Sequence, residues 1–327
     1  WMEKGMQWIA GHTSSSWVLG QPDITFLLLI MFLLGCLYEW GNRKKKRLAL
    51  FLLIGGLCAL VKHPLENEIT IIDIGQGDSI LLRDWQGRTI LIDTGGKVEF
   101  GQTEAWRKRQ SSTNAERTLI PYLKSRGIDQ IDHLVLTHTD ADHMGDMEVV
   151  ASSLHIKEVH VSKGSLKKAT FVKRLERLKL PVKTVEVGDR FPIFDRFVEV
   201  LYPMEVGDGS NNDSLVLYGY LQGVSFLFTG DLEEPGEQIL IARYPQLPVD
   251  VLKAGHHGSK GSSHPAFLDH IHAKIALVSA GEKNRYQHPH QETLERFKEL
   301  GMTVFRTDQQ GAIRFRGWQK WMIETVR

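Results

Sequence analysis

The sequence has little cysteine. Its 327 residues include two, Cys36 and Cys58, and both lie in apolar runs near the start of the chain. The part after residue 62 contains no cysteine, so it has neither a disulfide nor a thiolate metal ligand. A metal bound in that part has to be held by His, Asp or Glu side chains.

A strong excess of one charge is also missing. The formal net charge is +1, and residues 1–62 hold seven of the 40 Lys and Arg residues but three of the 39 Asp and Glu residues. The rest of the chain is therefore slightly acidic. This bulk charge gives no support for nonspecific nucleic-acid binding, so any phosphate-binding surface has to be local.

No apolar run reaches the ~20 residues that span a bilayer comfortably. Uncharged runs at 24–38 and 48–61 flank the basic stretch Arg43–Arg47. Buried core helices or a hairpin that dips into the membrane are alternatives. The neighbouring aromatic residues Tyr38 and Trp40 and the lysines favour spanning, because they settle at the membrane interface. We therefore expect a two-helix membrane hairpin.

The basic loop of this hairpin is expected to stay on the cytoplasmic side. Residues 63–327 would then lie on the extracytoplasmic side of the cell membrane, as one domain after a membrane-associated segment of residues 1–62. The chain opens on Trp1 rather than Met, which suggests a fragment of a longer membrane protein.

From Glu68 onward, short β-branched runs alternate with amphipathic segments and turn signals, a pattern typical of a layered α/β domain. The segments Trp85–Arg88 and Gln222–Gly223 are expected to be hairpin turns, and Lys97–Arg117 a long loop. Strands are expected at 69–74, 79–83, 89–92, 133–136, 158–161, 182–185, 197–201, 215–220, 224–228, 250–252, 275–278, 303–305 and 312–316.

The apolar run Leu134–Leu136 leads into four metal-competent side chains within six positions, namely His138, Asp140, Asp142 and His143. Imidazoles and carboxylates packed so closely need a cation among them, and mixed nitrogen and oxygen ligands suit zinc or manganese. The alternative is a polar loop that caps the next helix, but a cap requires a single Asp or Ser. The spacing therefore predicts a metal site.

Four further polar clusters follow other expected strands, at the strand ends where loops gather in α/β folds. They are Asp73–Ser79, Thr229–Asp231, Gly255–Ser259 and Ser279–Pro289. Each alone is a weak signal, since turns and helix caps use the same residues. Their recurrence after successive strands predicts that they share one site.

Together these motifs resemble the metallo-β-lactamase fold, an αββα sandwich with metals at the edge between two sheets. The resemblance is strongest to the C-terminal domain of the competence DNA-uptake channel ComEC, and the preceding helix pair resembles the end of that channel's membrane region. The motifs that carry the resemblance are Asp73–Ser79, Asp93–Gly96, His138–His143, Thr229–Asp231, Gly255–Ser259 and Asn284–Pro289.

The resemblance implies two divalent metal ions, Mn²⁺ or Zn²⁺, with Mg²⁺ as a further option. The ligands that it implies are His138 and Asp140 for the first ion, Asp142, His143 and His256 for the second, and Asp231 as the bridge. The sequence departs from the family in two places. Asp140 stands where His is usual, and residues 212–214 stand where another ligand His is expected. Oxygen ligands at the first ion would favour manganese or magnesium.

Further residues receive candidate roles. Asp142 is expected to be essential for catalysis, and His257 and His288 are candidates for protonating the leaving oxygen. A ligand-supporting or capping role is as plausible for either histidine. Asp78 and Asp93 are expected to orient ligands.

A further set of residues is expected to contact the substrate. The backbone amides of Gly258 and Ser259 can meet a phosphate oxygen. Lys253, Asn284 and Tyr286 are the side-chain candidates, with a solvated surface position as the alternative for Lys253.

The predicted function is a metal-dependent nuclease that acts on single-stranded DNA beside the other parts of a DNA-uptake assembly. The basic segment Lys167–Leu180 would guide the strand or form an ordinary solvated helix face. Two alternatives stay open at this point: a small-molecule ester or lactone hydrolase on the same scaffold, and a noncatalytic DNA-binding or gating module.

Overall fold

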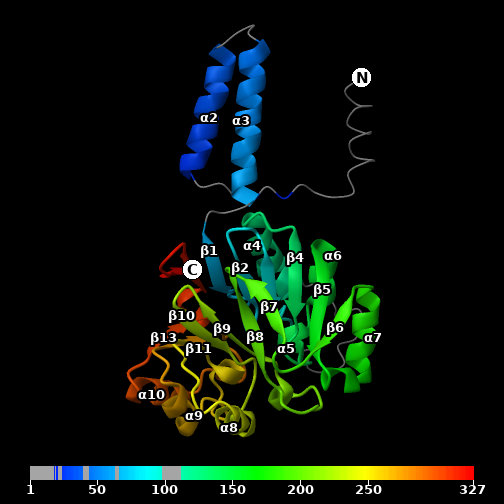
Figure 1. The fold of residues 1–327 in the computed structure, drawn as a ribbon, viewed down its shortest axis with the longest axis vertical. Coiled ribbons are helices and arrows are strands. Elements are labelled where there is room, and N and C mark those ends of the chain that lie inside the picture. The colour runs from blue at the N-terminus through cyan, green and yellow to red at the C-terminus, as the bar shows by residue number, and fades with distance from the viewer. Residues whose placement is uncertain (1–17, 19, 21–23, 40–43, 63–65, 98–111) are drawn as a thin grey trace. The chain divides into compact units, whose positions relative to one another are not determined.

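The computed structural model describes residues 18, 20, 24–39, 44–62, 66–97 and 112–327. The chain divides into two units, residues 1–63 with 122–129 and residues 64–121 with 130–327 (Figure 1). The expected loop Lys97–Arg117 falls largely outside the described residues. Its described end is helical rather than irregular, because η2 (Ala115–Leu119) begins there.

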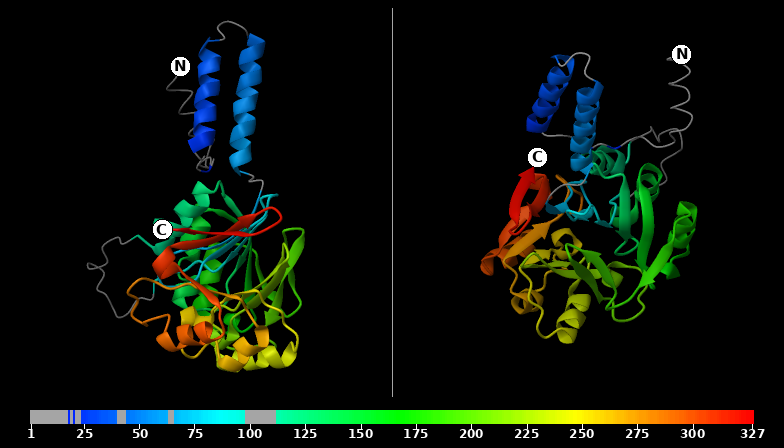
Figure 2. Two further views of the ribbon diagram at one scale, coloured as in Figure 1. Left: turned by 90° about the vertical axis from the view of Figure 1, so that its left-hand side faces the viewer. Right: turned by 45° about the horizontal axis from the view of Figure 1, so that its top comes forward.

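In the smaller unit, helices α2 (Ile24–Glu39) and α3 (Lys44–Lys62) pack side by side (Figure 2). Many of their apolar side chains face outward, including Leu28, Phe32 and Phe51, which are 60%, 68% and 71% exposed. Within the described ranges, no helix has both the length and the apolar content needed to cross a membrane. The two helices of the expected hairpin are present, and their placement in a membrane stays a prediction.

The larger unit contains two β-sheets. In the eight-stranded sheet the order is β15 (Met322–Val326), β14 (Ala312–Gly317), β1 (Asn67–Ile71), β2 (Ile80–Arg83), β3 (Thr89–Ile92), β4 (Gln130–Val135), β5 (His155–Ser162) and β6 (Val182–Val185). In the seven-stranded sheet the order is β13 (Thr303–Arg306), β12 (Ile275–Val278), β11 (Val251–Lys253), β10 (Val224–Phe228), β9 (Val216–Leu221), β8 (Arg196–Tyr202) and β7 (Arg190–Ile193).

The main core lies between the two sheets. Ile69 and Ile71 from β1 pack in the same apolar cluster as Phe226 and Phe228 from β10. A second apolar cluster joins the seven-stranded sheet to α8 (Glu234–Arg243), α9 (Pro265–Ile271) and α10 (Gln291–Glu299). On the other sheet, α6 (Met147–Ser153) packs on β5 and beside α7 (Ala169–Leu178). The unit is thus the α/β sandwich of two sheets and outer helices that the sequence predicted.

Short helical elements complete the chain. They are α4 (Ile120–Ser125), α5 (Ala141–Met144), η3 (Ser165–Lys167), η4 (Asn211–Asp213), η5 (Gly255–Gly258) and α11 (Thr307–Gln310). The expected hairpin turns join β2 to β3 and β9 to β10. Two strands escaped prediction, β7, which contains Pro192, and β15, which is mostly exposed at the sheet edge. Proline and the lack of an apolar face both weaken a strand signal.

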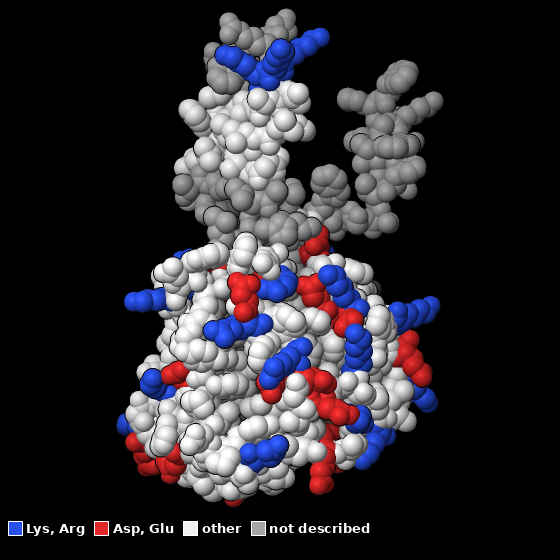
Figure 3. All heavy atoms as spheres, viewed as in Figure 1, with Lys and Arg blue, Asp and Glu red and all other residues white. Residues whose placement is uncertain are grey.

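The direction of the strands determines where the polar loops meet. Strands β3, β4 and β5 run parallel, and so do β10, β11 and β12. The carboxyl ends of parallel neighbours lie at one edge of a sheet, so the loops that follow them gather there. Over the face of the larger unit seen in Figure 3, acidic and basic side chains are interspersed, in keeping with its near-balanced charge.

The intersheet core gives a stability prediction. Phe226 is fully buried and its ring lies 5.3 Å from that of Phe315 and 5.8 Å from that of Trp321, centroid to centroid. Phe226→Ala is expected to lower the free energy of unfolding by about 3–5 kcal/mol in urea titrations, because it removes apolar burial and leaves a cavity. The control is Tyr220→Ala, at an exposed position on β9. Equal losses in the two variants would contradict this placement of the core.

Candidate metal centre

The predicted ligand-bearing loops meet at one edge of the sandwich. His138–His143 follows β4, Asp231 follows β10, and the pair His256 and His257 follows β11. These loops surround a cavity of about 320 Å³. Its lining consists of Gln76, Asp140, Ala141, Asp142, Asp231, His256, His257, Tyr286 and His288.

Two histidines on one side of the cavity point the same ring atom at each other. The Nε2 atoms of His143 and His257 lie 3.3 Å apart. The Nδ1 atom of His143 is 2.7 Å from Asp93 Oδ2, and that of His257 is 2.9 Å from the carbonyl oxygen of Ser279. Because each Nδ1 has an acceptor for its proton, neutral rings direct two Nε2 lone pairs at each other. A metal ion between them removes this repulsion.

Asp231 lies between the two groups of candidate ligands. Its Oδ1 is 3.0 Å from His143 Nε2, and its Oδ2 is 3.5 Å from His257 Nε2. The same Oδ2 lies 3.8 Å from His256 Nε2 and 3.9 Å from His138 Nε2. Ligands held ~2.0–2.2 Å from one ion are spaced about this far apart, so the carboxylate is placed to bridge two ions.

His138 forms the buried wall of the other side. Its Nδ1 lies 3.1 Å from Thr137 Oγ1 and 3.3 Å from Ser214 Oγ, and Asp140 Oδ2 lies 3.9 Å from its Nε2. Within the described residues, this buried Nε2 has no hydrogen-bond partner. A buried nitrogen without a partner is costly, and a metal ion would satisfy it. The residues present therefore fit a divalent ion on this side as well.

The adjacent histidines divide between the two sides. Both adopt left-handed backbone conformations, with φ of 45° at His256 and 54° at His257, which is uncommon for residues other than glycine. The Nε2 atom of His257 lies 3.4 Å from Asp142 Oδ2. Glu233 Oε1 lies 2.9 Å from the Nδ1 atom of His256, so the Nε2 atom of His256 faces Asp231. The sequence analysis expected His256 beside Asp142 and His143, whereas the structure places His257 there. Which ion each histidine binds stays a prediction.

The same geometry changes the expected chemistry of the first side. Residues 212–214 do not supply it with oxygen ligands, because Asn212 Oδ1 accepts from the amide of Glu233 and Ser214 Oγ accepts from the amide of Asp231. His256 is placed to contribute a second imidazole there. The first side thus offers two nitrogens and the carboxylates of Asp140 and Asp231, which suits zinc as well as manganese.

Charge and burial shift the pKa values in opposite directions across the centre. Burial, with the neighbouring His143, lowers the pKa of His138 to about 3. Burial also acts against protonation of His143, but Asp231 and Asp93 outweigh it and hold its pKa well above the ordinary value. Burial would raise the pKa of Asp231, yet His143 and His257 keep it well below its usual range. In the metal-free protein, protonated histidines thus balance the buried carboxylate.

Asp93 occupies the supporting position that was predicted for it. Besides its contact with His143, its side chain accepts hydrogen bonds from the amide and the hydroxyl of Thr137 at 2.8 and 2.7 Å. The loop that contains Gly77 packs tightly on the loop that contains Asp142. A Cβ on Gly77, whose φ is +122°, would lie 2.2 Å from the carbonyl oxygen of Asp142. Close approach of the two loops therefore requires glycine at this position.

Asp78 and Lys253 form a buried ion pair behind His257. The Nζ of Lys253 lies 2.6 Å from Asp78 Oδ2, and Asp78 Oδ1 lies 3.4 Å from His257 Nδ1. Burial would raise the pKa of Asp78, but Lys253 and His257 hold it below its usual range. Asp78 thus lies beside the candidate ligand His257, and its role in orienting a ligand stays a prediction. The expectation that Lys253 contacts substrate or solvent is wrong, because the side chain is enclosed and bound to Asp78 and to the Ala254 carbonyl oxygen.

The structure also describes the surroundings of three other residues that were expected to contact the substrate. The amide of Ser259 donates to the carbonyl oxygen of His256 at 2.8 Å, and Gly258 packs so closely on Pro289 that a Cβ would lie 2.6 Å from the proline Cβ. The amide of Ser259 is therefore already used within the loop, and the expectation for the amide of Gly258 stays a prediction. The Asn284 amide donates to the carbonyl oxygens of Gly281 and His288, so this side chain mainly holds its own loop in shape.

Tyr286 and His288 do reach the metal cavity. Their rings stack with centroids 5.6 Å apart, and the His288 ring lies 5.3 Å from that of His256. Burial and the neighbouring His257 lower the pKa of His288 to about 4. Both residues lie where a substrate would approach, and their roles stay predictions.

Two groups that orient the adjacent histidines were not predicted from the sequence. Glu233 orients His256, and its position two residues after Asp231 was an available signal. The Ser279 carbonyl that receives the His257 Nδ1 proton is a backbone atom, which no residue type reveals.

Comparison with known proteins identifies the family of the chain. Residues 72–282 match the metallo-beta-lactamase superfamily, and the chain belongs to that superfamily. Within it, the chain is a ComEC-like domain of the competence type, as the motifs predicted.

Two curated relatives illustrate this similarity. ComE operon protein 3 of Bacillus subtilis is 38% identical over 307 residues, which cover 90% of this chain and 38% of that protein. Competence protein ComA of Neisseria gonorrhoeae is 32% identical over 254 residues, covering 76% and 32% of the two chains. The chain thus spans about a third of the length of these relatives. Among solved structures, the metallo-beta-lactamase fold protein YhfI from Bacillus subtilis is 11% identical with a TM-score of 0.49, covering 77% of this chain and all of that one.

The division of the histidines can be tested by Mn²⁺ titration calorimetry. We expect His257→Ala and His143→Ala to weaken the same binding event, each by at least about 100-fold, with little further loss in the double variant. His256→Ala and His138→Ala should act together on the other event. The exposed His155→Ala is the control. Grouping of His256 with His143 would restore the assignment made from sequence.

The buried ion pair gives a second prediction. Lys253→Met leaves the Asp78 carboxylate buried without its partner, so urea unfolding with chelator present should show a loss of about 3–5 kcal/mol. The matched control is Lys274→Met, because Lys274 forms an exposed pair with Asp250 at 2.9 Å, and its loss should be at most about 1 kcal/mol. Similar losses in both variants would mean that Asp78 is not held as described.

Proposed function

We propose that the chain is a metal-dependent phosphodiesterase that cleaves single-stranded DNA at the extracytoplasmic side of a DNA-uptake channel. The observation that carries this proposal is the arrangement of two ligand groups around the shared carboxylate of Asp231. When bound there, two divalent ions would acidify water and neutralise charge that develops on a phosphoryl group.

The protein's own residues would prepare this chemistry. Asp93 and the Ser279 carbonyl hold the Nδ1 protons of His143 and His257, which leaves both Nε2 atoms free to act as ligands. Asp142 and His288 both line the cavity. Either is close enough to influence a phosphodiester that enters the cavity, and His288 remains our candidate for donating a proton to the leaving oxygen.

The choice of DNA rests on the relatives. One of them is named a competence protein and another a ComE operon protein, and the matches cover 76% and 90% of this chain. The location at the membrane rests on α2 and α3, which expose many large apolar side chains. Exposed apolar surface of this extent indicates an apolar neighbour, and we propose that the neighbour is the membrane.

A cleavage assay tests the proposal. The full chain, purified in detergent, is incubated with a single-stranded oligonucleotide and Mn²⁺, Zn²⁺, Mg²⁺ or a chelator, and with bis(p-nitrophenyl) phosphate and an acyl ester in parallel. We expect ion-dependent hydrolysis of both phosphodiesters. Asp142→Ala should reduce the rate at least about 100-fold without altering thermal unfolding, because it removes a metal ligand. Asp269→Ala, at an exposed position on α9, is the control.

Two outcomes would replace this function. Faster hydrolysis of the acyl ester than of either phosphodiester would indicate a small-molecule hydrolase on the same scaffold. Binding of the oligonucleotide without hydrolysis, under every ion tested, would indicate a noncatalytic DNA-binding or gating module.

A further inference from the structure

A second and larger cavity opens beside the metal cavity. Its volume is about 760 Å³, within the range of sites that hold a small ligand. Gln76, Asp142 and Tyr286 line both cavities, so the two spaces meet at the metal centre. A substrate bound at the ions can therefore extend into the larger cavity, which we call the side pocket.

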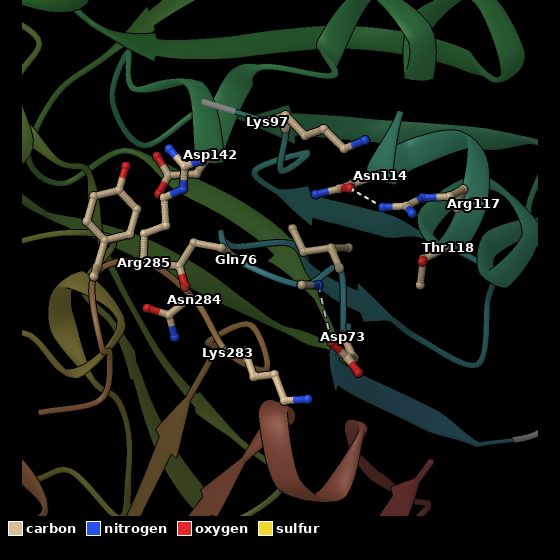
Figure 4. Close-up of a pocket in the computed structure, with 14 residues that line it drawn as sticks. Asp73, Gln76, Lys97, Asn114, Arg117, Thr118, Asp142, Lys283, Asn284 and Arg285 are labelled. Carbon is tan, nitrogen blue, oxygen red and sulfur yellow. Dashed lines mark hydrogen bonds between the residues drawn. The ribbon is translucent and has the colours of Figure 1, made fainter. Parts of the chain in front are cut away.

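The side pocket is locally basic although the large domain is not. Four cationic side chains line it, and Figure 4 shows them on its walls: Lys97, Arg117, Lys283 and Arg285. The carboxylates in the same lining are those of Asp73 and Asp142, the second of which belongs to the candidate metal centre. A surplus of positive charge next to a phosphodiester-cleaving site favours a polyanionic substrate.

Two of these cations are arranged to receive an anion. Arg117 lies exposed in the π-helical turn η2, and its Nη2 donates to Asn114 Oδ1 at 2.8 Å. Among the described residues it has no acidic partner, so its charge and remaining donors are available to a ligand. Lys283 is exposed and likewise forms no ion pair with a described residue.

The wall between the two cations is well ordered by its own contacts. The amide of Gly281 donates to Gln76 Oε1 at 3.2 Å, and a Cβ on Gly281 would lie 2.7 Å from the Gln76 nitrogen. This close packing fixes the loop that presents Lys283 against the loop that follows β1. Tyr286, which is 39% exposed, provides an aromatic face where the pocket joins the metal cavity. Aromatic faces of this kind stack nucleic-acid bases irrespective of sequence.

From these observations we infer that the side pocket binds one or two unpaired nucleotides on one side of the scissile phosphodiester. Arg117 and Lys283 contact the flanking phosphates, and Tyr286 stacks on the base nearest the ions. The inference rests on the proposed nuclease function and adds to it the residues that hold the strand. It also explains how a domain with slightly acidic bulk charge can bind DNA.

The test measures binding separately from cleavage. A fluorescein-labelled oligothymidylate of about 12 nucleotides is titrated with the full chain in chelator, at about 50 to 200 mM salt, and followed by anisotropy. The variant is R117A with K283A, and the control is R243A with K298A, which removes one exposed Arg and one exposed Lys elsewhere. We expect the variant to raise Kd about tenfold and to reduce the salt slope by roughly 1.4, since each lost phosphate contact in a single strand contributes ~0.7.

An unchanged Kd and salt slope in R117A with K283A would overturn the inference. If the double variant does not fold, K283A alone repeats the test with half the expected change in slope, because Lys283 is exposed. The two proposals fail separately. Loss of binding in the variant, combined with no cleavage by the wild-type protein under any ion, would refute the nuclease and support the strand-binding pocket.

Cleavage assays add a second readout. With DNA as substrate, KM of R117A with K283A should rise about tenfold, and the loss with bis(p-nitrophenyl) phosphate should be at least several-fold smaller, since that substrate is too small to reach both the ions and the two cations. Equal losses on both substrates would show that the two cations act on the metal centre instead of on the strand.

Discussion

The structure of the site depends on two imidazole nitrogens, Nε2 of His143 and Nε2 of His257, that face each other at 3.3 Å. Asp93 and the Ser279 carbonyl fix the tautomers of His143 and His257, and the resulting 3.3 Å contact is repulsive unless a cation or an added proton separates the rings. In the metal-free protein, the charge of Asp231 raises the pKa values of both histidines, which favours the added proton. A metal ion would supply the charge without protonation, which couples metal binding to proton release.

Much of this site could be predicted from sequence because strand direction and residue type determine it. A run such as Leu134–Leu136 identifies a buried strand, and the polar cluster after it has to lie at the strand's carboxyl end. The parallel pairing of β10 with β11 then brings Asp231 close to the histidine pair. The candidate ligands were therefore identified as a group, although they extend from His138 to His257 in the chain.

The division of roles within adjacent residues could not be predicted. His256 and His257 differ in function because two successive left-handed φ values turn their rings to different sides of Asp231, and residue type does not reveal those angles. Lys253 shows a second limit. A lysine at a strand end is usually exposed, and its burial follows from a carboxylate, Asp78, that lies far away in sequence. Long-range pairing of this kind has no local signal.

The local charge around the metal centre differs from the bulk charge of the domain, and this difference affects how the domain would bind an anion. The candidate metal ligands carry no permanent positive charge, because the charge of the centre depends on bound ions or on protonated histidines. The side pocket places permanent positive charge beside that centre, on Arg117 and Lys283, which come from segments far apart in the sequence. Because guanidinium and ammonium charges do not depend on bound metal, strand binding and metal loading can vary independently. In the function that we propose, attraction of the strand therefore belongs to the pocket, and bond cleavage to the ions.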